Sequence, residues 1–127
     1  MTMDEYFDTV KGFGVLATAG GDGKVNAAVF ARPHVMDEQT VAFIMAERLT
    51  YENLRSNPWA TYIFLEEGGG WAGKRLYLRK IREEENEELR REICRRCDYS
   101  RYDVRKRFIV HFRVERELPL IGAGEER

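Results

Sequence analysis

The chain has 127 residues, of which 43% are hydrophobic, and this suits one ordinary globular domain over residues 1–127. Its formal net charge of -1 argues against a dedicated nucleic-acid-binding protein, which usually carries a net basic surface. The apolar runs are all far shorter than the ~18 residues that cross a bilayer, and residues 1–10 do not resemble a signal peptide, so we expect a cytoplasmic protein without a membrane partner.

The chain begins with the pattern of a short helix. Thr2 and Glu5 have the spacing of a capping box, which predicts a helix over residues 3–11. Gly12 and Gly14 should end this helix and let the chain turn.

A β-hairpin is predicted next. The Gly-Gly-Asp-Gly sequence at residues 20–23 is a strong turn signal, and the strands on either side should span residues 15–19 and 24–31. Pro33 should end the second of these strands.

The middle of the chain predicts two strands with a helix between them. A turn at residues 37–39 precedes a strand over residues 40–46 that is apolar on both faces, and we expect this strand to be buried. Thr50 is predicted as the N-cap of a helix that Asn57-Pro58 stops. Residues 59–66 then form the fourth predicted strand.

The last part of the chain predicts two more strands and a helix. Residues 75–81 and 108–114 alternate as strands do, and residues 83–97 carry acids early and arginines late, as a helix dipole favours. The tail from Leu118 should be irregular. The chain therefore predicts a mainly β fold with helices, a closed or partly closed barrel of six mostly antiparallel strands.

The best candidate for chemistry is the junction between the third strand and the helix that follows. A helix N-terminus offers free N–H groups and a positive partial charge, and it is a natural anion site. Arg48 adds bidentate donors and Thr50 adds a hydroxyl, so this junction could hold a phosphate. The alternative is that Thr50 only caps the helix and Arg48 is a solvated charge.

The second strand offers small side chains beside one amide. In the run from Asn26 to Val29, the small residues would let a planar ring lie close to the backbone, and Asn26 could bond the polar edge of that ring. A strand that faces a tight core would have the same composition, so this alternative stays open.

In their order along the chain, these segments resemble the pyridoxamine 5′-phosphate oxidase-related FMN-binding split-barrel family, in a small bacterial branch. The resemblance is carried by residues 26–32, 41–45, Arg48-Leu49-Thr50, Asn53-Leu54, Asn57-Pro58, 73–78 and 118–122. It implies a homodimer with FMN in a cleft between the subunits. The residues that it implies near FMN are Asn26, Ala27, Ala28, Val29, Phe43, Ile44, Met45, Arg48, Leu49, Thr50 and Asn53, with Trp71 and Arg75 reaching the flavin of the other subunit.

Two departures from the family pattern bear on function. Many relatives carry a lysine where Thr50 aligns, so this site has one cation fewer. The arginine- and tryptophan-rich C-terminal segment of true pyridoxamine phosphate oxidases has no counterpart before Arg127, so that activity is not assigned.

The histidines, the C-terminal arginines and the two cysteines are better explained without a functional role. His34 and His111 are predicted on the surface, and the arginines of residues 90–107 as a solvated face. Cys94 and Cys97 have the spacing of a redox pair but lack its βαβ surroundings, and no metal site is predicted.

The resemblance leaves three hypotheses for function. The first is an FMN-dependent oxidoreductase, whose electron donor and substrate the sequence does not name, with the flavin carrying the redox chemistry. The second is a non-catalytic flavin-binding protein for electron transfer or storage. The third is the same fold with haem or a deazaflavin as its ligand.

Overall fold

The computed structural model describes residues 1–93 and 106–122, which form one antiparallel sheet and three short helices. The strands are β1 (Gly12–Ala19), β2 (Val25–Phe30), β3 (His34–Asp37), β4 (Thr40–Ala46), β5 (Trp59–Glu66), β6 (Gly73–Glu84) and β7 (Arg107–Pro119). The helices are α1 (Met3–Thr9), α2 (Leu49–Ser56) and α3 (Glu87–Ile93). The ranges predicted for β4 and β5 are confirmed.

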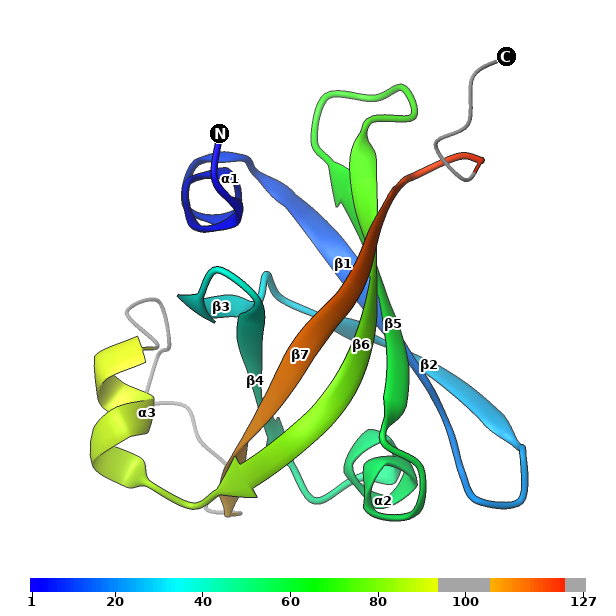
Figure 1. The fold of residues 1–127 in the computed structure, drawn as a ribbon, viewed down its shortest axis with the longest axis vertical. Coiled ribbons are helices and arrows are strands. Elements are labelled where there is room, and N and C mark those ends of the chain that lie inside the picture. Colours follow the sequence, from blue (N-terminus) through cyan, green and yellow to red (C-terminus); the bar gives the residue numbers. More distant parts are fainter. Residues whose placement is uncertain (94–105, 123–127) are drawn as a thin grey trace.

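Within the described residues the sheet has seven strands, not six, and every pair of neighbouring strands is antiparallel. The order β2-β1-β5-β6-β7-β4-β3 leaves β2 and β3 at its two edges, so the barrel is split and not closed (Figure 1). β3 is not predicted from the sequence, because its four residues directly follow Pro33 and become a strand by pairing with β4.

The first helix begins as predicted. Thr2 Oγ1 accepts a hydrogen bond from the Glu5 N–H at 3.1 Å. Phe7 is buried against Phe64, with ring centroids 5.3 Å apart, so α1 packs on the inner side of the sheet. The prediction that Gly12 and Gly14 form a turn was wrong, because both lie within β1.

Tyr62 explains why a glycine stands at position 14. A Cβ at Gly14 would lie 2.1 Å from the Tyr62 hydroxyl oxygen. That hydroxyl is within hydrogen-bond distance of the carbonyls of Phe30 and Ala31, at 3.2 and 3.1 Å. Tyr62 therefore crosses the inside of the barrel and ties the end of β2 to β5.

The predicted helix over residues 83–97 was wrong at its start. Glu83 and Glu84 belong to β6, and α3 begins only at Glu87. Charged residues at this position resembled a helix start, but here they continue a strand that pairs with β7. Cys94 and Cys97 lie outside the described residues. The predicted irregular tail begins two residues later than Leu118, because Leu118 is buried within β7, which ends at Pro119, and residues 120–122 are irregular.

His111 is the clearest error of the sequence analysis. It was predicted on the surface, but it is only 1% exposed. Its Nε2 lies 2.7 Å from Glu84 Oε2, and this carboxylate also bonds Arg82 at 2.7 Å. Burial tends to raise the pKa of Glu84, but these two partners outweigh it and hold the pKa below its usual range.

Inside the barrel, inward side chains of five strands, β1, β4, β5, β6 and β7, form one core. Its fully buried members include Leu16, Val41, Tyr62, Phe64, Leu76, Leu78, Val110 and Phe112. No helix within residues 1–93 and 106–122 is both long and apolar enough to span a membrane.

Candidate functional site

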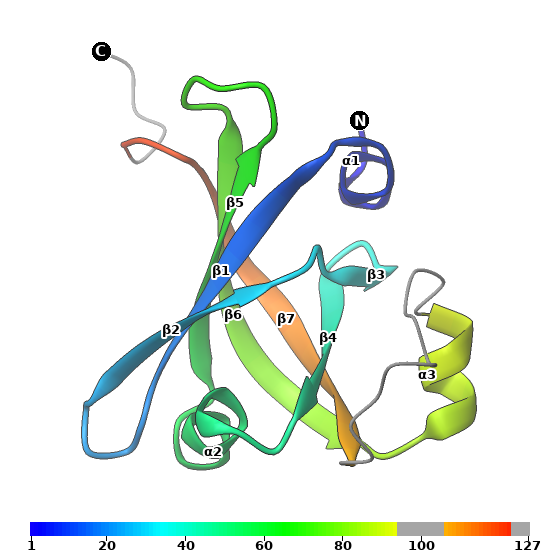
Figure 2. The same ribbon diagram turned by 180° about the vertical axis from the view of Figure 1, so that it is seen from behind.

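Within residues 1–93 and 106–122, two strand edges lack a neighbouring strand, one along β2 and one along the last part of β4. Within the described residues, β2 pairs with β1 alone. The pairing between β3 and β4 ends at Ala42, so residues 43–46 pair on one side only, with β7. Figure 2 shows the start of β2 and the end of β4 at the end of the molecule that holds α2. Edge backbone groups of this kind can bind a partner or a ligand.

The start of α2 follows β4 directly. Arg48 is the N-cap residue, and no side chain caps the helix there. The prediction that Thr50 is the N-cap was wrong, because Thr50 lies inside the first turn and is buried. Without a side-chain cap, the first N–H groups of α2 can take a partner from outside the helix.

Polar side chains fasten α2 to the β1–β2 hairpin. Asn26 Nδ2 donates to Thr50 Oγ1 at 3.3 Å, and Asn53 Nδ2 donates to Thr18 Oγ1 at 3.1 Å. At the end of the helix, the backbone N–H of Gly21 donates to Ser56 Oγ at 3.0 Å. The predicted residues Asn26, Thr50 and Asn53 are thus brought together, although Thr50 and Asn53 use these side-chain atoms within the protein.

A second group of contacts joins α2 to β6. Tyr51 donates its hydroxyl hydrogen to Glu83, and Lys80 Nζ lies 2.6 Å from Glu83 Oε1. Burial and this carboxylate raise the pKa of Tyr51 to about 12. Burial tends to raise the pKa of Glu83, but the hydrogen bonds from Lys80 and Tyr51 lower it below its usual range. Tyr51 also stacks on Phe108 at 4.3 Å, so α2 is held on both sides.

The other predicted residues of β2 and β4 are divided between two faces. Ala27 and Val29 are exposed on the outer face, whereas Ala28 points inward and is half-buried. Phe43 and Met45 lie in the core, so only their backbone groups could face a ligand, and Ile44 is half-buried on the opposite face.

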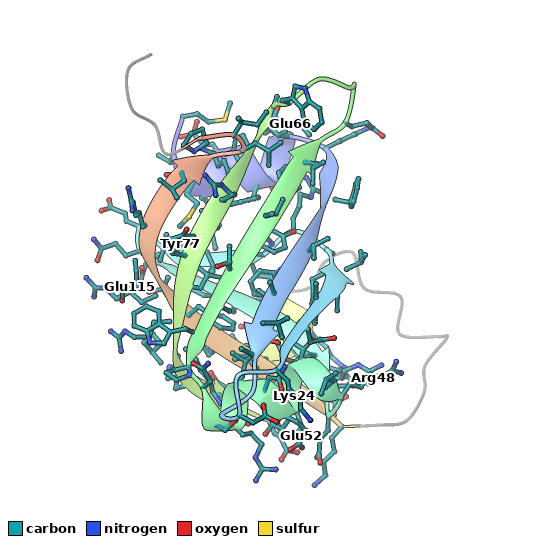
Figure 3. All side chains as sticks on the ribbon, turned by 90° about the vertical axis from the view of Figure 1, so that its right-hand side faces the viewer. Lys24, Arg48, Glu52, Glu66, Tyr77 and Glu115 are labelled. Carbon is teal, nitrogen blue, oxygen red and sulfur yellow. The ribbon has the colours of Figure 1, made fainter. Side chains whose placement is uncertain are left out.

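The charged and aromatic candidates lie at opposite ends of the molecule. Arg48 and Leu49 are exposed at the start of α2, and Figure 3 shows Arg48 at the same end as Lys24 and Glu52. Trp71 lies in the β5–β6 loop and is 75% exposed. This loop follows Glu66, which is at the other end in Figure 3.

Arg75 has partners of its own in the same chain. Its Nε donates to the Pro119 carbonyl at 2.9 Å, and its Nη2 donates to the Gly122 carbonyl. Arg75 therefore fastens the end of the described chain to β6. In one protomer, neither Trp71 nor Arg75 joins the site at α2.

The outward side chains of β2, β1 and β5, together with Tyr77 of β6, form a mostly apolar surface, which we call the outer face, and Arg75 and Arg79 lie beside it on β6. Cross-strand pairing places Ala27, Ala17, Thr61 and Tyr77 in one row across it. Val25 and Val29 are 85% and 72% exposed at its β2 edge. The other members of the outer face include Phe13, Val15, Trp59 and Ile63. An apolar surface of this kind is typical of a protein interface.

Sequence reasoning missed Thr18 altogether. Thr18 is 4% exposed, and it is the cross-strand neighbour of Asn26 in β1. Its partner Asn53 is 35 residues away in sequence, so no local pattern could have revealed the contact. A polar residue at an inward position of a strand was the one available signal.

Comparisons with known proteins agree on the fold. No protein-family model matches the chain, and no curated protein matches it significantly. An FMN-binding protein from Syntrophomonas wolfei is similar in structure, with a TM-score of 0.75, 18% identity, and coverage of 98% of this chain and 85% of that one.

Two further solved structures show the same similarity. An F420 reductase has a TM-score of 0.68 and 19% identity over 92% of this chain and 97% of that one. A candidate pyridoxamine 5′-phosphate oxidase from Lactobacillus delbrueckii has a TM-score of 0.68 and 14% identity over 93% of each chain. The chain therefore has the split-barrel fold of the pyridoxamine 5′-phosphate oxidase-like, FMN-binding proteins.

Proposed function

We propose that this protein binds a flavin-type cofactor, FMN, at a homodimer interface and acts as an oxidoreductase. The observation that carries the proposal is the position of the uncapped start of α2 beside the unpaired edges of β2 and β4. Backbone donors and acceptors along the two edges suit a polar planar ring, and the start of α2 suits a phosphate. Similar solved structures include an FMN-binding protein, which supports this assignment.

The residues at the start of α2 would hold the phosphate. Arg48 supplies a cation with bidentate geometry, and the first N–H groups of α2 supply donors. Leu49 would cover the ribityl chain. Thr50 and Asn53 would lie beside the ribityl chain in buried positions, because each side chain is hydrogen-bonded to the β1–β2 hairpin.

The two strand edges would hold the ring. The small side chains of Ala27 and Ala28 would let the ring lie close to the β2 backbone. Asn26 and Val29 lie at either end of this short segment. On β4, the backbone of residues 43–45 would line the other side, because the side chains of Phe43 and Met45 are in the core.

The outer face would be the dimer interface. It is mostly apolar across β2, β1 and β5, and a second copy of the same face would remove Val25, Val29 and Trp59 from water. In that dimer, Trp71 of the partner subunit and Arg75 of the partner subunit would approach the cofactor, as the family resemblance implies.

The cofactor would supply the electron-transfer chemistry, while the chain would bind and orient it and exclude water. The similarity to an F420 reductase favours a deazaflavin as the second candidate ligand. A protein that binds FMN without turnover is the remaining alternative.

An absorption spectrum and the mass of the released ligand test the proposal first. We expect flavin bands near 370 and about 450 nm that follow the ligand into solution on heat release, with the mass of FMN, and bleaching by a nicotinamide donor. A deazaflavin mass would select the second candidate. A yellow protein inert to NADH and NADPH would support binding without turnover. A colourless protein that does not quench the fluorescence of added FMN would refute flavin binding.

Arg48 gives a sharper test of the phosphate position. Arg48→Ala should weaken FMN binding about tenfold, because one charge-assisted contact is lost, and should leave riboflavin binding nearly unchanged. Arg55→Ala is the matched control, since Arg55 is an exposed arginine in the last turn of the same helix. Equal losses in the two variants would refute the placement of the phosphate at the start of α2.

A further inference from the structure

Four polar side chains join α2 to the hairpin in one layer. Thr18 and Asn26 are cross-strand neighbours on the inner face of β1 and β2. Thr50 and Asn53 are three residues apart on α2, so they lie on the same side of the helix. The hydrogen bonds Asn26–Thr50 and Asn53–Thr18 therefore run side by side from the hairpin to the first turns of α2.

Of the two hydrogen bonds in this layer, one is buried and the other is partly exposed to solvent. Thr18 and Asn53 are 4% and 8% exposed, so the bond between them is buried. Asn26, in contrast, is half-buried on the β2 edge strand. A buried polar pair has a strong directional preference, because an amide that leaves its partner finds no water to replace it.

The helix depends on such contacts for its position. It has eight residues, and a helix this short has little stability of its own. Its apolar residue Leu54 is buried, but apolar packing tolerates small rotations and shifts that a buried hydrogen bond does not. The Thr18–Asn53 bond is therefore suited to fix where α2 starts relative to β2.

We propose that Thr18 is a positioning residue for the cofactor. Through Asn53 it sets the place of the start of α2 beside the edge of β2, and so it sets the affinity of the site for the phosphate end of the ligand. Thr18 does not itself face the ligand, because its side chain is buried against α2. This inference rests on the proposed function, since it assumes that the phosphate binds at the start of α2.

Paired titrations with FMN and riboflavin, followed by flavin fluorescence, test this role. The two ligands differ only in the phosphate, so a misplaced helix start should weaken FMN binding much more than riboflavin binding. Thr18→Val keeps the shape of the side chain and removes the acceptor. We expect it to weaken FMN binding about tenfold and to change riboflavin binding by less than about twofold. Thr18→Ser keeps the hydroxyl and should restore wild-type FMN affinity.

Thr9→Val is the matched control. It also removes a threonine hydroxyl that is hydrogen-bonded, to the Glu5 carbonyl at 2.7 Å, but on α1. We expect wild-type affinity for both ligands. Circular dichroism and the urea midpoint show whether each variant is folded, and Thr18→Cys, which keeps a weak acceptor, takes the place of Thr18→Val if that variant does not fold.

The outcomes separate the two proposals. Equal losses of FMN and riboflavin affinity in Thr18→Val, or no loss of either, would overturn the positioning role while flavin binding stands. A wild-type protein that binds both ligands equally would overturn the positioning role and the phosphate placement together. A wild-type protein that binds neither would overturn the proposed function itself.

Discussion

The dimer proposal makes a specific prediction for Ala17, which lies near the middle of the outer face. Ala17 pairs across the strands with Ala27 and Thr61, and its neighbours along β1, Leu16 and Thr18, point into the core. A larger side chain at Ala17 therefore extends outward and leaves the core of the protomer undisturbed. Ala17→Glu should leave the unfolding free energy of the protomer within about 0.5 kcal/mol of the wild type.

The effect on dimerisation should be much larger. In a two-fold interface the substitution occurs twice, and each buried carboxylate without a partner costs a few kcal/mol. Even about 2 kcal/mol per copy, or about 4 kcal/mol in all, corresponds to a dimer dissociation constant about 1,000-fold higher. The flavin content should fall as the dimer dissociates, because Trp71 of the partner subunit and Arg75 of the partner subunit would no longer reach the site.

Sedimentation velocity over a range of protein concentrations measures this change. Thr9→Glu is the control, since it adds the same charge at an exposed position of α1. We expect a dimer for the wild type and for Thr9→Glu, and a monomer for Ala17→Glu at micromolar concentration. A wild-type protein that is monomeric, or an Ala17→Glu dimer as tight as the wild type, would refute the outer face as the interface.

Two further predictions concern the barrel and the support of α2. Gly14→Ala should lower the unfolding free energy by about 2 kcal/mol in urea titrations, because its Cβ would lie 2.1 Å from the Tyr62 hydroxyl oxygen; an unchanged urea midpoint would contradict this contact. Glu83→Gln should cost about 1 kcal/mol at neutral pH. Because folding lowers the pKa of Glu83, its ionised form stabilises the protein above the unfolded-state pKa, and this stability is lost as the pH falls through the folded-state pKa. The wild type and Glu83→Gln should therefore converge in urea titrations at acid pH, and a gap that does not narrow would contradict the role of this carboxylate.

The strands that the sequence predicts well are those whose environment is uniform along their length. Residues 40–46 and 59–66 alternate or are apolar throughout, and both ranges are confirmed as β4 and β5. The end of β6 has no such pattern, because Glu83 and Glu84 are polar on both faces of the strand. Glu83 bonds Tyr51 of α2 and Glu84 bonds His111 of β7, so contacts distant in sequence keep this segment extended.

The same limit explains the error at His111. Alternation along β7 places His111 opposite Val110 and Phe112, which are in the core, and this pattern predicts that the opposite face is exposed to solvent. Ile109 on the same face is also fully buried, so this part of β7 is covered on both sides. A one-dimensional pattern tells which residues share a face, but it does not tell how many faces of a strand are covered.

The candidate site was predicted as a set of residues, yet its members can act on a ligand in different ways. Arg48 and Ala27 are exposed, so they can contact a ligand directly. Asn53 is buried and bonded to Thr18, and Arg75 is bonded to the Pro119 carbonyl, so within one protomer each would have to break a bond before it could bind a ligand through the same atoms. We therefore expect substitutions of the exposed members to act mainly on ligand affinity, and substitutions of Asn53 and Arg75 to change affinity and stability together. A residue such as Thr18, which no motif includes, should belong to the second group, because it shares its hydrogen bond with Asn53.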